Sequence, residues 1–321
     1  NCKAGIEVGT EKAWDLCEEY KLPRIIFVTN MDDDHASFRE LILKLEKKFG
    51  RKIAPFQVPI RENEKFVGFV NAVKMQGRRF TNLSDYEDCE IPEYTKKNLG
   101  IIRDALIEAV AETSEEYMER YFSGEEFTPE EVIVGVSQGV KSGTISPVFC
   151  GDAMLMRGME QFMDGLCWLA PSAADKGAEI GVDVDGNPVE IAVKEDAATA
   201  AIVFKTVADP FIGKLSYVKV LSGKISTETP LINMRTGNTE RVGKTVMMCG
   251  KKQEDVKAIT AGDIGAIPKL AGVNTGDTLC APARKVTLDG IAYPTPEMRM
   301  AIVPKLSLIH ISEPTRPRLI S

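Results

Sequence analysis

The sequence predicts an α/β domain built on a parallel sheet, followed by an all-β barrel domain. Three observations support this fold class. The chain has 321 residues, which is more than one hydrophobic core usually serves. Residues 9–49 follow the order helix, strand, loop, helix, as in a doubly wound α/β fold. From residue 192 to about residue 289, short alternating runs are broken by Gly turns roughly every 8–14 residues, which is typical of a small barrel.

The composition is that of an ordinary globular protein, with 44% hydrophobic and 27% charged residues. No apolar run approaches the roughly 20 residues needed to cross a bilayer. The seven Cys residues form no CxxC pair, which favours scattered reduced thiols and a cytoplasmic location over disulfides or a zinc site. The net charge of −7 gives no global attraction to nucleic acid, so any RNA contact would need local basic patches.

The first elements of the α/β domain follow from the spacing of apolar residues. Residues 9–20 place apolar side chains at helical intervals, and Pro23 ends that pattern. Residues 24–29 form a short β-branched run, as in a buried strand of a parallel sheet. A turn over residues 30–34 then precedes an amphipathic helix, which is predicted from about His35 to Phe49.

The rest of the α/β domain contains both helical and strand patterns. Residues 66–70 have β character, and a long helix is predicted from about residue 92 to residue 121. A second buried strand is predicted at 145–150, with a helix at about 158–170. Residues 173–190 are interpreted as a linker with a hairpin turn.

The barrel strands are predicted from runs of alternating apolar residues between Gly turns. They cover 201–206, 215–221, 230–233, 244–248 and 263–269.

Both ends of the sequence carry separate expectations. Residue 1 is not Met, so the coding frame is expected to begin upstream. Residues 306–316 resemble the in-frame translation of a sequencing adapter, so residues 306–321 are expected to be a non-native tail. A natural basic tail is the alternative. Setting the tail aside leaves His35 as the remaining histidine.

Several separated segments occur together in the order known from one protein family. They are Gly5–Trp14, Pro147–Ala153, Phe204–Leu215, Gly250–Glu254, Ala261–Ala266 and Ala301–Lys305. Together they resemble elongation factor G, a translational GTPase, across essentially residues 1–305. The resemblance implies the following domains: part of a GTP-binding domain at 1–172 with an inserted subdomain at about 52–130, a linker at 173–190, the second-domain barrel at 191–290, and the start of a third domain at 291–305.

The resemblance also implies a guanine site made of two loops. Thr29-Asn30-Met31-Asp32 falls on the family's Asn-Lys-Met-Asp position, and Gly151-Asp152-Ala153 falls on its last guanine-contacting loop. A carboxylate beyond a strand can accept hydrogen bonds from both the ring N–H and the exocyclic amine of guanine, a donor pair that adenine lacks. Without the resemblance, three consecutive aspartates would instead predict a cap on the next helix. Asp33 and Asp34 are assigned to the turn and this cap.

Three of these residues depart from the family's pattern. Thr29 replaces an Asn, Asn30 replaces a Lys whose aliphatic stem lies along the base, and Asp152 replaces a Ser. Loss of the Lys stem removes apolar cover worth roughly 1–2 kcal/mol. The departures therefore favour weaker guanine binding.

The sequence contains no G-x-x-x-x-G-K-[ST] phosphate loop. In the family this loop, the Mg²⁺ contacts and the catalytic His lie upstream. The resemblance thus implies GTP or GDP with Mg²⁺ as the cofactor of the full-length protein, and no catalytic or metal-ligating residue within this chain. His35 is interpreted as a surface residue at a helix start. The chain by itself is expected to have no GTPase activity.

The function implied by the resemblance is GTP-dependent ribosomal translocation by a monomer that contacts no membrane. Its partners would be the ribosome and, indirectly, the tRNA–mRNA complex. Lys205, Lys214, Lys251 and Lys252 are candidate contacts to ribosomal RNA. Two alternatives stay open: a ribosome-binding paralogue with weak or absent GTP hydrolysis, and a tetracycline-type ribosome protection factor, which shares the domain layout.

Overall fold

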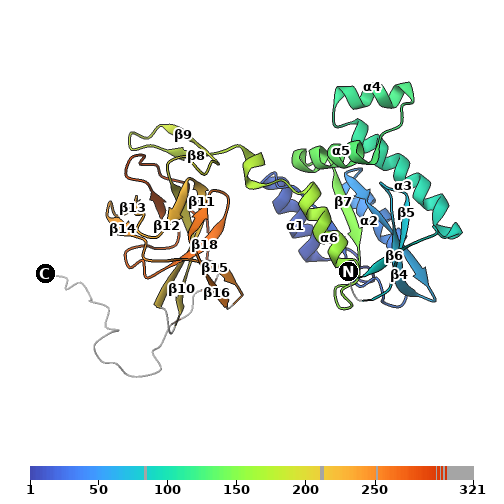
Figure 1. Ribbon diagram of the computed structural model, residues 1–321, viewed down its shortest axis with the longest axis horizontal. Coiled ribbons are helices and arrows are strands. Elements are labelled where there is room, and N and C mark those ends of the chain that lie inside the picture. The colour runs from blue at the N-terminus through green and yellow to red at the C-terminus, as the bar shows by residue number, and fades with distance from the viewer. Residues whose placement is uncertain are drawn as a thin grey trace. The chain divides into compact units, whose positions relative to one another are not determined.

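The computed structural model describes residues 1–82, 85–209, 213–250, 252–293, 295–296, 298 and 301. The chain divides into two compact units, Asn1–Gly177 and Ala178–Ser321. Figure 1 shows the elements of each unit. The expected non-native tail at 306–321 lies outside the described residues, so its interpretation stays a prediction. Within the described part of the chain, no helix combines the length and the apolar character needed to span a membrane.

A three-stranded parallel sheet organises the first unit. Its order is β1 (Ile26–Val28), β7 (Ser146–Cys150), β2 (Ile53–Pro55), and β7 is buried along its whole length. Successive side chains of a strand point to opposite faces of the sheet. Val148 accordingly joins one hydrophobic cluster and Phe149 joins the other. The predicted parallel α/β sheet is therefore confirmed.

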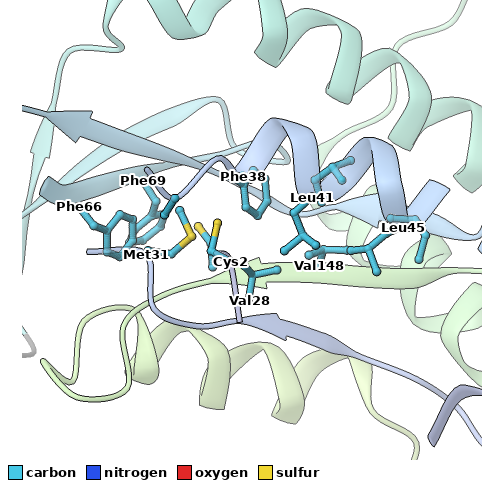
Figure 2. Close-up of a cluster of buried hydrophobic side chains, with 13 residues drawn as sticks. Cys2, Val28, Met31, Phe38, Leu41, Leu45, Phe66, Phe69 and Val148 are labelled. Atoms are coloured by element: carbon cyan, nitrogen blue, oxygen red, sulfur yellow. The ribbon is translucent and has the colours of Figure 1, made fainter. Parts of the chain in front are cut away.

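The first cluster packs α2 (Phe38–Phe49) against one face of this sheet (Figure 2). Leu41 and Leu45 lie four residues apart on the buried side of α2, where they can meet Val28 and Val148 of the sheet. Helix α1 (Val8–Glu19) precedes β1 in the chain and contributes Trp14, whose ring stacks on Phe49 with centroids 4.1 Å apart.

Helix α2 begins later than the sequence predicts. Ser37 is its N-cap residue, and the Oγ of Ser37 accepts a hydrogen bond from the Glu40 N–H at 3.4 Å. His35 is exposed and has φ 63°, a left-handed backbone that cannot belong to the helix. The interpretation of Asp33 and Asp34 as caps is wrong, because both lie in the turn before Ser37.

The second cluster covers the opposite face of the sheet with three helices. They are α3 (Glu93–Ala111), α5 (Pro129–Ser142) and α6 (Met159–Leu169). The single helix predicted over 92–121 is in fact α3 and α4 (Glu115–Ser123). The break occurs because Ser114 caps a new helix, its Oγ accepting the Tyr117 N–H at 3.1 Å.

Helix α5 was not predicted, although its start signal is present in the sequence. Thr128 and Glu131 form a capping box around Pro129, the first helical residue. Gly143 ends the helix in a left-handed conformation with φ 76°.

A four-stranded antiparallel sheet lies between α2 and α3 in sequence, after β2. Its strands are β3 (Gln57–Glu62), β4 (Lys65–Asn71), β5 (Gln76–Phe80) and β6 (Tyr86–Cys89), in that spatial order. Phe66 and Phe69 of β4 belong to the same cluster as α2, as Figure 2 shows. Strand β4 is thus placed against the end of the parallel sheet where the candidate site lies.

The second unit is an antiparallel β domain. Eight of its strands form one sheet in the order β14-β13-β19-β10-β11-β18-β15-β16, and β12 pairs with β17. The bounds are β10 (Ala200–Asp209), β11 (Gly213–Ser222), β12 (Lys224–Ser226), β13 (Pro230–Asn233), β14 (Thr239–Arg241), β15 (Thr245–Cys249), β16 (Lys252–Val256), β17 (Ala258–Thr260), β18 (Ile264–Pro268) and β19 (Thr278–Cys280). Side chains from most of these strands enclose one apolar core, which explains the alternation seen in the sequence.

A hairpin opens the second unit, formed by β8 (Ala178–Val182) and β9 (Pro188–Ala192). The expected linker at 173–190 contains a short 3-10 helix and most of this hairpin. Ile191 is fully buried in a cluster with Val286 and Leu288, which attaches the hairpin to residues 286–288.

A buried carboxylate holds one end of the β domain together. Asp277 is 4% exposed and accepts hydrogen bonds from Arg235 Nε at 2.6 Å, Asn233 Nδ2 at 2.7 Å and the Asn274 N–H at 2.8 Å. Burial by itself would raise the pKa of Asp277, but these donors outweigh it, and the pKa lies below the usual value.

This depressed pKa predicts a specific acid sensitivity. A carboxyl whose folded-state pKa is lowered stabilises the fold above its unfolded pKa of about 3.9, and this stabilisation is lost as the pH falls through the folded value. In a fragment spanning residues 178–293, Asp277→Asn should reduce the melting temperature at pH 7 and flatten its decline below about pH 4. Thermal unfolding followed by circular dichroism across that pH range checks this. Parallel wild-type and variant curves would show that Asp277 does not govern acid stability.

Candidate functional site

The two loops predicted to form a site lie side by side at one edge of the parallel sheet. Residues 29–32 follow β1 and residues 151–153 follow β7, and these strands are parallel neighbours. The Gly151 N–H donates to the Val28 carbonyl at 2.9 Å, and the Met31 N–H donates to the Gly151 carbonyl at 3.3 Å. The structure therefore brings together all seven residues of the two predicted loops.

Backbone geometry and burial fix the first loop. Asn30 adopts a left-handed conformation with φ 60°, which Asn tolerates better than most residues. The next side chain, Met31, is fully buried and packs in the cluster shown in Figure 2. The Thr29 carbonyl accepts the Cys2 N–H at 2.9 Å, so the start of the chain braces the loop from outside.

Gly151 stands where the two loops come closest to the sheet. A Cβ atom at this position would lie 2.5 Å from the Arg157 carbonyl oxygen and 2.6 Å from the ring of Phe27. Neither neighbour can yield without moving the backbone or the core. Only glycine fits there.

Asp152 organises the second loop from inside. Its side chain is buried, and Oδ1 accepts the N–H groups of Met154 and Leu155 at 3.0 and 3.1 Å. Its Oδ2 accepts the Asp32 N–H at 3.3 Å, which ties the second loop to the first. The carboxylate is therefore directed at loop backbone. A Ser hydroxyl, which the family has here, could not accept from both sides with two separate oxygens.

The Asp32 carboxylate already has partners within the protein. Its Oδ1 accepts the Phe66 N–H of β4 at 2.9 Å and lies 3.5 Å from a guanidinium nitrogen of Arg157. The same Arg157 nitrogen donates to the Phe66 carbonyl at 2.8 Å. Asp32, Arg157 and Phe66 thus form a closed triangle that anchors the antiparallel sheet to the loop after β1.

Two arginines of this site were missed at the sequence level. Arg157 follows β7 by seven residues, and Arg61 lies on β3, where its guanidinium donates to the carbonyls of Asp33, Ala36 and Glu64. Both arginines reach the turn that contains Asp32 and Asp33 only because the antiparallel sheet packs against the parallel sheet. The spacing of residues along the chain does not indicate these contacts.

The residues present fit a guanine nucleotide only in part. Recognition of guanine by a carboxylate uses both oxygens at once. Oδ1 of Asp32 is taken by Phe66 and Arg157, and among the described residues no hydrogen bond reaches Oδ2, so one oxygen stays open. Asn30 offers no long aliphatic stem to cover the base, and the sequence holds no glycine-rich phosphate loop with its Lys.

Comparison with known proteins identifies the β domain. Residues 198–282 match the family described as elongation factor G domain 2. The chain is elongation factor G-like. A crystal structure of a protein from Thermus thermophilus aligns with a TM-score of 0.74 and 25% sequence identity over 94% of this chain. The alignment covers 41% of the Thermus chain, so the present chain spans less than half of that protein's length.

These findings confirm the resemblance to translational GTPases and the order of an α/β domain before an elongation factor G domain 2. The four lysines considered for RNA contact belong to this second domain. Lys205 and Lys214 lie on the paired strands β10 and β11, and Lys252 forms an ion pair with Glu254 at 2.7 Å. Lys251 lies outside the described residues. Their role stays a prediction.

The close approach at Gly151 yields a stability prediction. Gly151→Ala should lower the free energy of unfolding of the first unit by about 1–3 kcal/mol, because the added methyl overlaps Phe27 and the Arg157 carbonyl. Both tryptophans of the chain lie in this unit, so urea unfolding followed by tryptophan fluorescence reports on it.

Gly100→Ala is the matched control. Gly100 lies within α3, where a Cβ would meet nothing within 4 Å, so this change should add up to about 1 kcal/mol through helix propensity. Equal stability of wild type and Gly151→Ala would contradict the packing described for the loop.

Proposed function

We propose that this chain is part of a GTP-dependent translation elongation factor that acts on the ribosome. The observation that carries the proposal is the match of residues 198–282 to elongation factor G domain 2, together with the α/β unit that precedes it. The proposed activity of the longer protein is ribosomal translocation by a cytoplasmic monomer. Its partners are ribosomal RNA and proteins, and the tRNA–mRNA complex is moved indirectly.

In this proposal the two loops at the edge of the parallel sheet contact the base of GTP or GDP. Thr29, Asn30, Met31 and Asp32 form one wall, and Gly151, Asp152 and Ala153 form the other. Mg²⁺ would accompany the phosphates, whose cradle is supplied by residues outside this chain. Nucleotide exchange would then affect the antiparallel sheet, because the Phe66 N–H of β4 donates a hydrogen bond to the Asp32 carboxylate.

A second candidate function is favoured by one observation. The Asp32 carboxylate is held by Arg157 and by the Phe66 N–H, and the residues at positions 29 and 30 differ from the family's pattern. A ribosome-binding paralogue that binds guanine weakly and hydrolyses GTP poorly would have such a loop. Such a paralogue would keep the domain arrangement, and Asp32 would serve to connect the loop after β1 with β4.

The nucleotide part of the proposal predicts weak binding by the chain itself. In this fold most nucleotide affinity comes from backbone N–H groups, a Lys and Mg²⁺ around the phosphates. Residues 1–321 should therefore bind GDP no tighter than about 1 mM, or about −4 kcal/mol. A titration with fluorescent GDP measures this, with Asp32→Asn as the comparison. Submicromolar binding by the wild-type chain would refute it.

The ribosome part of the proposal predicts a salt-sensitive interaction of the second unit. The double variant Lys205→Glu/Lys214→Glu should weaken cosedimentation with bacterial ribosomes by about tenfold, because each lost phosphate contact reduces counterion release. Lys224→Glu is the control, since Lys224 lies on β12 in the separate two-stranded sheet. Binding that is equally strong in both variants and unaffected by salt would exclude these two lysines as the RNA contact.

A further inference from the structure

The first unit contains a small cavity away from the two loops. It has a volume of about 130 Å³ and lies between α6 and the antiparallel sheet β3–β6. Among the described residues, none from 29–32 or 151–153 lines it. The cavity is thus separate from the candidate guanine site.

A buried amide in this cavity has no partner. Gln161 of α6 is 7% exposed, and neither its Nε2 nor its Oε1 forms a hydrogen bond with any residue that the structure describes. Nearly all buried side-chain amides in proteins are hydrogen-bonded, because an unpaired one loses its water without compensation. Gln161 lines the cavity, so a buried donor and a buried acceptor without partners belong to its wall.

A second buried donor lines the same cavity. The Nε of Arg78 on β5 is buried without a hydrogen bond within the described part of the chain, and the nearest carboxylate oxygen, of Asp88, is 3.7 Å away. The Arg78 guanidinium is held in place over the ring of Tyr86 at 4.4 Å. Two independent polar groups are thus unsatisfied at one point in the fold.

Aromatic side chains form one part of the cavity wall: Phe56, Phe69, Tyr86, Phe149 and Trp168. The other lining residues are polar or charged and include Lys74 and Asp164 besides Gln161 and Arg78. The rings of Phe56 and Phe149 lie 5.1 Å apart at an angle of 31°. An apolar protein cavity of about 150 Å³ accommodates one benzene molecule, so the space here suits one ring. The flat aromatic side chains favour a planar ligand, and the polar ones favour a ligand with hydrogen-bonding groups.

We propose that this cavity binds a planar single-ring heterocycle that carries an amide edge, meaning a carbonyl beside an N–H group. The Gln161 carboxamide is complementary to such an edge: Nε2–H donates to the ligand carbonyl and Oε1 accepts the ligand N–H. Glutamine reads paired donor and acceptor edges of nucleobases in this bidentate way. The aromatic walls hold the two faces of the ring, and Trp168, which is 48% exposed, lies at the opening.

The proposal is tested with uracil and nicotinamide as probes on the full chain. Uracil has a cyclic amide edge, and nicotinamide carries a carboxamide on one ring. Both should bind saturably in ligand-observed NMR and change tryptophan fluorescence, since Trp168 lines the cavity. 1,3-Dimethyluracil, which keeps the ring and carbonyls but has no N–H, should bind at least about tenfold more weakly.

Variants locate the binding. Gln161→Leu keeps the size of the side chain and removes both unpaired atoms, so it should raise the melting temperature and weaken uracil binding at least about tenfold. Trp168→Ala, at a half-exposed position that tolerates truncation, should also weaken uracil binding. Gln253→Leu on β16 is the matched control and should bind uracil like the wild type.

Ordered water is the competing explanation, because water can satisfy a buried amide. In that case neither uracil nor nicotinamide would bind at millimolar concentration, and the proposal would be overturned. Uracil binding that is unchanged in both Gln161→Leu and Trp168→Ala would overturn it equally.

Discussion

The parallel pairing of β1 with β7 is the constraint on which the first unit depends. Phe27 pairs with Phe149 and Val28 with Cys150, so the two strands end at the same level. Residues about 120 positions apart in the chain therefore meet beyond one edge of the sheet. The same pairing divides the side chains between two faces, and each face then requires its own covering helices. The core and the candidate site both follow from this one register.

Local pattern was sufficient to predict β1, β7 and most helices, but it did not reveal the short buried strand β2. The run Ile145–Cys150 is apolar enough to indicate a central strand, and β7 covers nearly the same residues. Where the helix predictions were wrong, the cause was local hydrogen bonding that competes with periodicity. Ser37 and Ser114 each cap a helix start, which delays α2 and divides the predicted long helix in two. The capping box at Thr128 could have revealed α5.

Only the two loops that directly follow β1 and β7 could be predicted as parts of the candidate site. Resemblance placed residues 29–32 and 151–153, and the topology brings them together. Arg157 and the Phe66 N–H could not be found this way, because their contact with Asp32 depends on how a separate sheet docks. Burial raises the pKa of the Cys150 thiol at the end of β7, which keeps that end of the strand uncharged. Such effects belong to the assembled core, and sequence spacing does not encode them.

The Asp at position 152, where the family has Ser, is physically connected with the contact between Arg157 and the Asp32 carboxylate. The backbone groups of Asp152 and Arg157 exchange hydrogen bonds, N–H to carbonyl in both directions, at 2.8 and 3.0 Å. The loop between them is shaped by the Asp152 carboxylate, which accepts two N–H groups inside it. This turn therefore determines where the Arg157 side chain starts, and its guanidinium reaches Asp32. A carboxylate at position 152 also adds negative charge beside Asp32, and the Arg157 guanidinium offsets that charge. The altered loop thus supplies its own counterion, and a guanine base would have to compete with it for the same aspartate.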